Sequence, residues 1–233
     1  MKHTLKVTAL LVFFFFLAQL VGLLVINQYI DHKASIETQE VVMKPLPYNL
    51  ERPEVENQST SFIYITIAIL IGTVLVLLLI KLNKPFIWRL WFFVTVWITL
   101  AIAFAAFIDN TIAAILALVI SVLKLYKPNI IIQNLSEIFI YGGLASIFVP
   151  MINLFAAFML LIVISIYDFI AVFKTKHMIK LAKFQSKSKV FPGLLIPYEK
   201  GKILVKSSIS QGKEPQQKNL RMAVLGGGDI GFT

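Results

Sequence analysis

Long apolar runs, separated by short polar segments, account for most of the chain. Six of these runs come close to the length of about 20 residues that an α-helix needs to cross the hydrocarbon core of a bilayer. The pattern therefore predicts an all-α polytopic membrane protein with six transmembrane helices. They are expected at about residues 7–26, 62–82, 86–108, 111–125, 130–149 and 151–173. A seventh apolar segment begins near Met222 and reaches Thr233.

The composition supports this assignment, because 58% of the 233 residues are hydrophobic and only 15% are charged. The chain has no cysteine, which excludes disulfides and thiolate metal sites. Its three histidines, at positions 3, 32 and 177, lack the spacing of metal ligands. We therefore expect neither a metal nor an organic cofactor.

The net charge of +10 could indicate a nucleic-acid partner, but the distribution of Lys and Arg indicates membrane orientation instead. With the N-terminus in the cytoplasm, the cytoplasmic segments hold 19 of the 22 basic residues and the outer segments hold 3. The first run follows Lys2 and Lys6 as a signal peptide would. It is longer than a usual signal-peptide core and lacks an A-x-A-like cleavage site, so we interpret it as a retained span.

Three regions follow from this count. Residues 1–173 form the six-span region, which includes a polar outer loop at 31–60. Residues 174–220 form a basic cytoplasmic loop, which is either a plain positive-inside anchor or a surface for anionic lipid or a protein partner. Residues 221–233 begin a seventh span. The expected localisation is the cell membrane, with no nucleic-acid partner.

Two aspartates interrupt membrane-length apolar sequence: Asp168 in ISIYDFIAVF and Asp229 in MAVLGGGDIGF. An ionisable group at bilayer depth costs about 2.5–3.5 kcal/mol by insertion scales, so each aspartate is a functional-site hypothesis. Asp168 lies five residues before the inner end of its span, and Asp229 about seven residues after the inner start of the next. At a rise of 1.5 Å per residue these depths are about 7.5 and 10.5 Å. Antiparallel packing of the two helices would place both carboxylates in one layer.

Two neighbouring carboxylates can share one proton and divide the roles of general base and general acid. This chemistry predicts aspartyl peptide hydrolysis, provided that water reaches the site. The three glycines at 226–228 each disfavour a helix by about 1 kcal/mol relative to Ala. They also permit close approach of another backbone. A loosened helix start exposes N–H and C=O groups, with which an extended substrate strand could pair.

These residues resemble a known family. Tyr167-Asp168 and Gly226-x-Gly228-Asp229 resemble the YD and GxGD motifs of the presenilin and signal-peptide-peptidase family of intramembrane aspartyl proteases. The resemblance implies a nine-span fold in which Asp168 and Asp229 are catalytic, Tyr167 supports the first aspartate, and Gly226 and Gly228 shape the site. The implied substrates are transmembrane segments of membrane proteins or remnant signal peptides. The small size is similar to that of archaeal members.

One departure from the family pattern affects the expectation for activity. The family carries a Pro-Ala-Leu motif in its last span, and this sequence contains no such tripeptide. We therefore expect the chain to correspond to about the first two-thirds of the family fold, C-terminally truncated, and not to be active alone.

Other interpretations of the same residues exist. Gly226, Gly228 and Gly231 also fit G-x-G-x-x-G, the first turn of a dinucleotide-binding domain. Prepilin-type peptidases use a motif similar to GxGD. A transporter or structural membrane protein could also carry an intramembrane aspartate as an ion site or a helix–helix hydrogen bond. Glu137, inside the fifth span, is expected to be paired or to face water.

Overall fold

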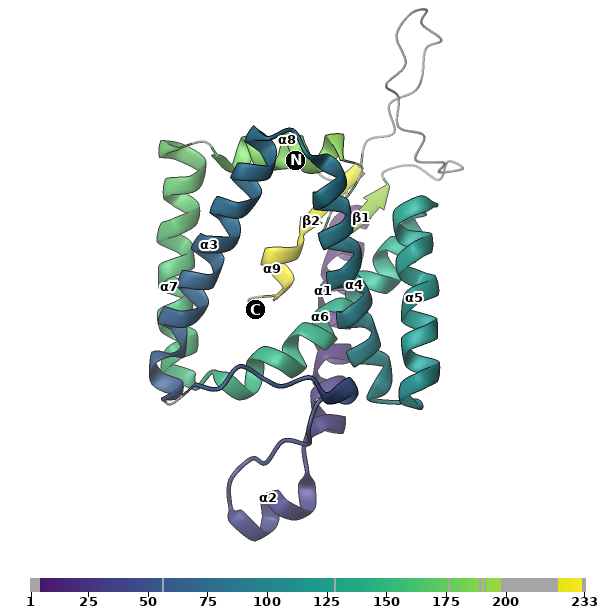
Figure 1. Cartoon of the computed structure of the whole chain (residues 1–233), viewed down its shortest axis with the longest axis vertical. Coiled ribbons are helices and arrows are strands. Elements are labelled where there is room, and N and C mark those ends of the chain that lie inside the picture. The colour runs from purple at the N-terminus through teal and green to yellow at the C-terminus, as the bar shows by residue number, and fades with distance from the viewer. Residues whose placement is uncertain are drawn as a thin grey trace, which may run out of the picture.

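The structure is a computed structural model, and it describes residues 5–55, 57–127, 129–175, 177–188, 190, 192–197 and 222–231. Helices dominate this part of the chain (Figure 1). The six main ones are α1 (Leu5–Tyr29), α3 (Ser61–Lys81), α4 (Pro85–Ala105), α5 (Asn110–Tyr126), α6 (Ile130–Phe148) and α7 (Leu154–Phe169).

The six predicted spans correspond one by one to these helices, and the prediction of an all-α polytopic membrane protein is confirmed. In the described part of the chain, five apolar helical stretches reach the length required to cross a bilayer. The fourth predicted span, α5, has 17 residues and is the shorter apolar helix of the set. At 1.5 Å per residue it is about 26 Å long, slightly less than the hydrocarbon core.

The starts of three helices follow from capping residues in the short turns. The side chains of Asp109, Asn129 and Asn153 each accept a backbone N–H from the first turn of α5, α6 and α7, respectively. Such caps satisfy N–H groups that have no partner within the helix. The polar residues that separate the apolar runs therefore also determine where the next helix begins.

The helices pack in two groups. Helices α1, α4, α5 and α6 form one group, and α3 packs with α7 beside it (Figure 1). Adjacent glycines on α6 allow the close packing of the first group: a Cβ at Gly143 would overlap the Thr99 carbonyl of α4, and one at Gly142 would lie 3.0 Å from Val25 of α1. Small residues permit such close helix approach in membranes, where packing replaces the hydrophobic driving force.

The described residues of the predicted outer loop contain three short helical elements. They are α2 (His32–Thr38), η1 (Pro47–Asn49) and η2 (Gln58–Thr60). Side chains of the loop hydrogen-bond the ends of the long helices. Arg52 donates to the carbonyls of Lys44 and Ser146, at 2.7 and 3.1 Å. The hydroxyl of Tyr48 donates to the carbonyl of Asn110 at 2.6 Å. The loop is therefore held against the ends of α5 and α6.

The region after α7 differs from the simple expectation of a loop followed by a helix. It contains α8 (His177–Lys187), β1 (Gly193–Pro197), β2 (Met222–Gly226) and α9 (Gly227–Gly231), and residues 198–221 lie outside the described part. The two strands pair antiparallel, with Gly193 opposite Gly226 and Pro197 opposite Met222. The predicted start of the seventh helix at Met222 is thus strand, and the helix begins at Gly227, because pairing with β1 holds 222–226 extended.

A buried ion pair joins α5 to α6. The Lys124 Nζ lies 2.6 Å from Glu137 Oε1, and both side chains are at most 3% exposed. Lys124 also donates to Ser136 Oγ, and Gln133 Nε2 donates to Glu137 Oε1. The expectation that Glu137 is paired is confirmed. A pair this deep is stabilising only when hydrogen bonds satisfy its remaining polar atoms, and here Ser136 and Gln133 supply them.

Removing one partner should therefore destabilise the protein strongly. We expect Lys124→Met to lower the free energy of unfolding by about 3–5 kcal/mol, because Glu137 is left charged and buried. Replacing both residues, with Lys124→Met and Glu137→Leu, should recover part of this loss. Thermal unfolding in detergent micelles measures it, with Lys127→Met, an exposed lysine one turn away, as the control. Equal shifts for Lys124→Met and Lys127→Met would contradict the prediction.

Candidate active site

Asp168 lies near the end of α7, two residues before the helix changes its hydrogen-bonding pattern. Residues Ile170–Lys174 continue as a π-helical turn. Such turns leave backbone groups less regularly paired and are frequent at functional sites. The Asp168 side chain is exposed at the surface of the described chain, so the carboxylate is accessible from outside the helix bundle.

Tyr167, the residue before it, is held by two other elements. Its hydroxyl lies 2.8 Å from the Thr73 hydroxyl of α3 and 3.1 Å from His177 Nε2 at the start of α8. The other ring nitrogen of His177 hydrogen-bonds the Thr175 hydroxyl. Sequence reasoning did not identify Thr73 or His177 at the site. The contacts fix the orientation of the last turns of α7, and with it the backbone that carries Asp168.

Asp229 lies in α9, immediately after the strand β2. Its backbone is described, but its side chain lies outside the described part of the structure. The next residue, Ile230, is 2% exposed and packs with Ala18 of α1 and Ile138 of α6. Gln19 of α1 donates from Nε2 to the Ile230 carbonyl at 3.1 Å. No pattern in the sequence indicates that Gln19 contacts this segment.

The glycines before Asp229 differ in their surroundings. A Cβ at Gly227 would lie 2.9 Å from the Tyr141 hydroxyl of α6, closer than real Cβ contacts. A Cβ at Gly228 would meet no heavy atom within 4 Å. Gly226 ends β2 opposite Gly193, whose φ of 145° favours glycine. Of the three glycines expected to permit close approach, Gly227 is the one that α9 presents to α6. That Gly226 and Gly228 shape the site stays a prediction.

The two aspartates belong to different packing groups. The main partner of α7 is α3, whereas α9 packs on α6, α1 and the two strands. In the projection of Figure 1, α9 and β2 lie between the α3–α7 pair on the left and α1, α4 and α5 on the right, above α6. That the two carboxylates meet in one layer stays a prediction.

The dinucleotide-binding interpretation of 226–231 does not fit this geometry. A strand and a helix do surround Gly226, as that motif requires. The strand, however, pairs antiparallel with β1, whereas a dinucleotide site forms in a parallel βαβ unit. Both strands also pack against α1 through Val7, Ile196 and Ala223.

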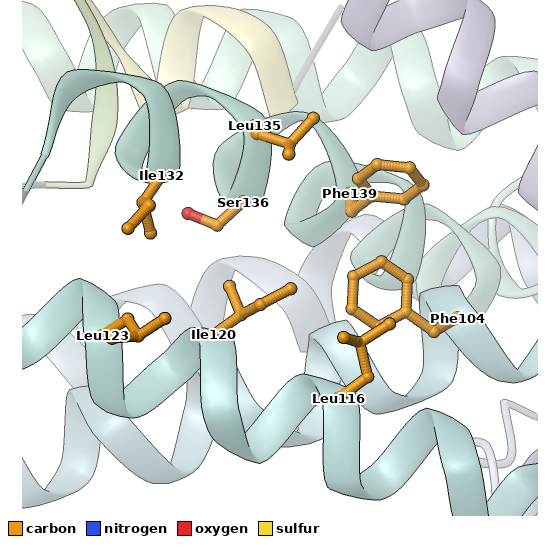
Figure 2. Close-up of a pocket in the computed structure, with 8 residues that line it drawn as sticks. All are labelled: Phe104, Leu116, Ile120, Leu123, Ile132, Leu135, Ser136 and Phe139. Carbon is orange, nitrogen blue, oxygen red and sulfur yellow. The ribbon is translucent and has the colours of Figure 1, made fainter.

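An apolar cavity of about 240 Å³ lies elsewhere, between α4, α5 and α6. Figure 2 shows its lining side chains facing one another across the helix interface. Ser136 is its one polar lining residue, and that hydroxyl already serves Lys124 and the Gln133 carbonyl. The cavity is smaller than a typical ligand site and contains no candidate catalytic residue, so we do not assign it to the active site.

Comparison with known proteins gives one match. The family model described as signal-peptide peptidase, presenilin aspartyl protease matches residues 21–232. No curated protein and no solved structure matches the chain.

The contrast between Gly227 and Gly228 yields a prediction about the docking of α9. We expect Gly227→Ala to loosen α9 from α6, because the added methyl group would overlap the Tyr141 hydroxyl. Hydrogen–deuterium exchange of residues 222–231 should then be faster than in the unmodified protein. Gly228→Ala, the matched control, adds a methyl group in open space and should leave exchange close to the original rate. Faster exchange in the Gly228 variant than in the Gly227 variant would refute this account.

Proposed function

The chain belongs to the signal-peptide peptidase and presenilin family of aspartyl proteases, and on this premise we propose that it acts as an intramembrane aspartic endopeptidase. Its substrates are transmembrane segments or remnant signal peptides. The observation that supports the proposal most directly is the pair of aspartates in apolar surroundings. Asp168 follows Tyr167 at the end of α7, within a helical stretch long enough to cross a membrane, and Asp229 follows the glycines that open α9.

In the proposed mechanism the two carboxyl groups share one proton, because two negative charges at close range repel each other. The ionised member removes a proton from a water molecule, which attacks the carbonyl carbon of the scissile peptide. The protonated member donates a hydrogen bond to the carbonyl oxygen and then helps to protonate the leaving amine. Tyr167, held by Thr73 and His177, is a positioning residue for Asp168.

The sheet suggests how an extended substrate is held. Asn134 of α6 bonds both the N–H and the C=O of Leu195, so the outer edge of β1 is occupied. In an antiparallel ladder the groups of Val224, opposite Leu195, then point away from β1. A substrate strand would pair along this outer side of β2, which leads directly into Gly227 and Asp229.

The protein is a multi-pass membrane protein, and we propose the cell membrane as its location. The excess of Lys and Arg in the N-terminal segment and in 174–220 supports a cytoplasmic position for both. The sheet and the end of α7 would then lie towards the cytoplasmic face. Cleavage is accordingly expected in the cytoplasmic half of a substrate helix.

The central test uses the protein expressed from its complete reading frame and reconstituted in lipid vesicles. A single-span reporter serves as the substrate, and mass spectrometry identifies the products. Asp168→Asn and Asp229→Asn should each reduce cleavage at least about a hundredfold, since the amide can neither accept nor supply the required proton. Asp109→Asn is the matched control, because asparagine caps a helix as well as aspartate. If either the Asp168 or the Asp229 variant still cleaves the reporter at the original rate, the catalytic assignment is wrong.

A second prediction concerns the Tyr167 hydroxyl. Tyr167→Phe should lower kcat about tenfold and change KM less, because it removes the contacts to Thr73 and His177 without touching either aspartate. Tyr64→Phe, an exposed tyrosine on α3, is the control. Adding His177→Ala to the Tyr167 variant should cause little further loss, because both act through one hydrogen bond. Fully additive losses would argue against this shared role.

A further inference from the structure

Two consecutive amide side chains, Gln133 and Asn134, bind β1 from the face of α6 that contacts the strand. Asn134 accepts the Leu195 N–H at Oδ1 and donates from Nδ2 to the Leu195 carbonyl, both at 2.8 Å. This cyclic pair reproduces the hydrogen bonds that a neighbouring strand would make. The two hydrogen bonds therefore fix the backbone of Leu195 at one position along α6.

Gln133 binds the strand two residues away. Its Nε2 donates to the Gly193 carbonyl at 2.9 Å and to Glu137 Oε1 at 3.0 Å. Glu137 is held in turn by Lys124, so the ion pair orients the amide that reaches the strand. Gly193 and Leu195 are alternate residues, which present their outward backbone groups on the same edge.

A sheet of two five-residue strands needs such external support. Two-stranded ribbons are marginally stable alone. A buried face opposes a one-residue slip but not a slip of two residues, which keeps the same side chains inward. The strands are separated by 24 residues, 198–221, whereas the hairpin loops whose geometry sets strand register have about two to five. The side chains of α6 hydrogen-bond individual residues of β1 and so determine the position of β1 along the helix. Because β1 pairs with β2, the same contacts determine the position of Gly226 and of the start of α9.

We propose that Gln133 and Asn134 are positioning residues that set the register of the sheet, and thereby select which peptide bond of a substrate is cleaved. The inference rests on the proposed function, since an added substrate strand would take its register from β2. If β1 shifts along α6, β2 and the substrate shift with it. A one-residue slip would turn the buried Leu194 and Ile196 outward, so the accessible slip is two residues.

The test compares Asn134→Leu, which keeps the size but cannot form either hydrogen bond, with Asn134→Asp, which keeps the acceptor for the Leu195 N–H. Hydrogen–deuterium exchange of 193–197 should rise about tenfold in the Leu variant and less in the Asp variant, as expected for the loss of a net hydrogen bond. Mass spectrometry of reporter products should show a second cleavage site, two residues from the original, in the Leu variant. Ser121→Ala is the control, because among the described residues this buried hydroxyl donates to the Ala117 carbonyl of its own helix and to no strand.

The outcomes separate the two proposals. Exchange at β1 reports on the contacts from α6 whether or not the protein cleaves anything, so unchanged exchange in Asn134→Leu overturns the inference by itself. Cleavage at a single, unchanged position in a variant whose exchange has risen also overturns it, and leaves the endopeptidase proposal standing. A third outcome is also possible: Asn134→Leu cleaves nothing, while Asn134→Asp shows raised exchange but still cleaves at the single original site. This result would show that Asn134 has a structural role alone, and it would likewise contradict register selection.

Discussion

Backbone N–H and C=O groups that lie among membrane helices must find partners within the protein, because lipid offers none. Helices meet this requirement internally, but the two strands after α7 do not. The polar side chains of α6 supply what is missing: Asn134 and Gln133 bond the outer edge of β1, and the Lys124–Glu137 pair holds Gln133 in place. The position of the sheet, and of α9 behind it, depends on this face of α6.

The same helix is the centre of the packing. Its glycines allow α1 and α4 to approach closely, and its Tyr141 meets α9 at Gly227. Gln19 of α1 and the cluster around Ile230 complete the attachment of α9. The element that carries Asp229 is thus attached to a rigid group of helices through several independent contacts.

Asp168 is positioned by a different set of contacts. The α3–α7 pair carries it, and Tyr167 connects that pair to α8 through Thr73 and His177. A site assembled from two helix groups requires both to be placed correctly relative to each other. Each aspartate then has its own supporting residues, which explains why the expected effects of Tyr167 and of Gly227 are separate.

The sequence by itself determined the approximate positions of the six apolar helices and named Asp168, Asp229 and Tyr167 as candidate site residues. Those features are local. An apolar run of membrane length must be helical in lipid, and an ionisable residue within it can be identified from the sequence alone, whatever that helix packs against. Only the tertiary structure decided that 222–226 is strand and that Gly227 is the crowded glycine. It also showed the contacts of Tyr167 with Thr73 and His177, of Gln19 with α9, and of Asn134 with β1. The physical reason is that these features depend on partners distant in the chain, as with Asn134 and Leu195, which are 61 residues apart. The polar residues of α6 were visible in its apolar sequence, but no local pattern could name the backbone groups that they bind.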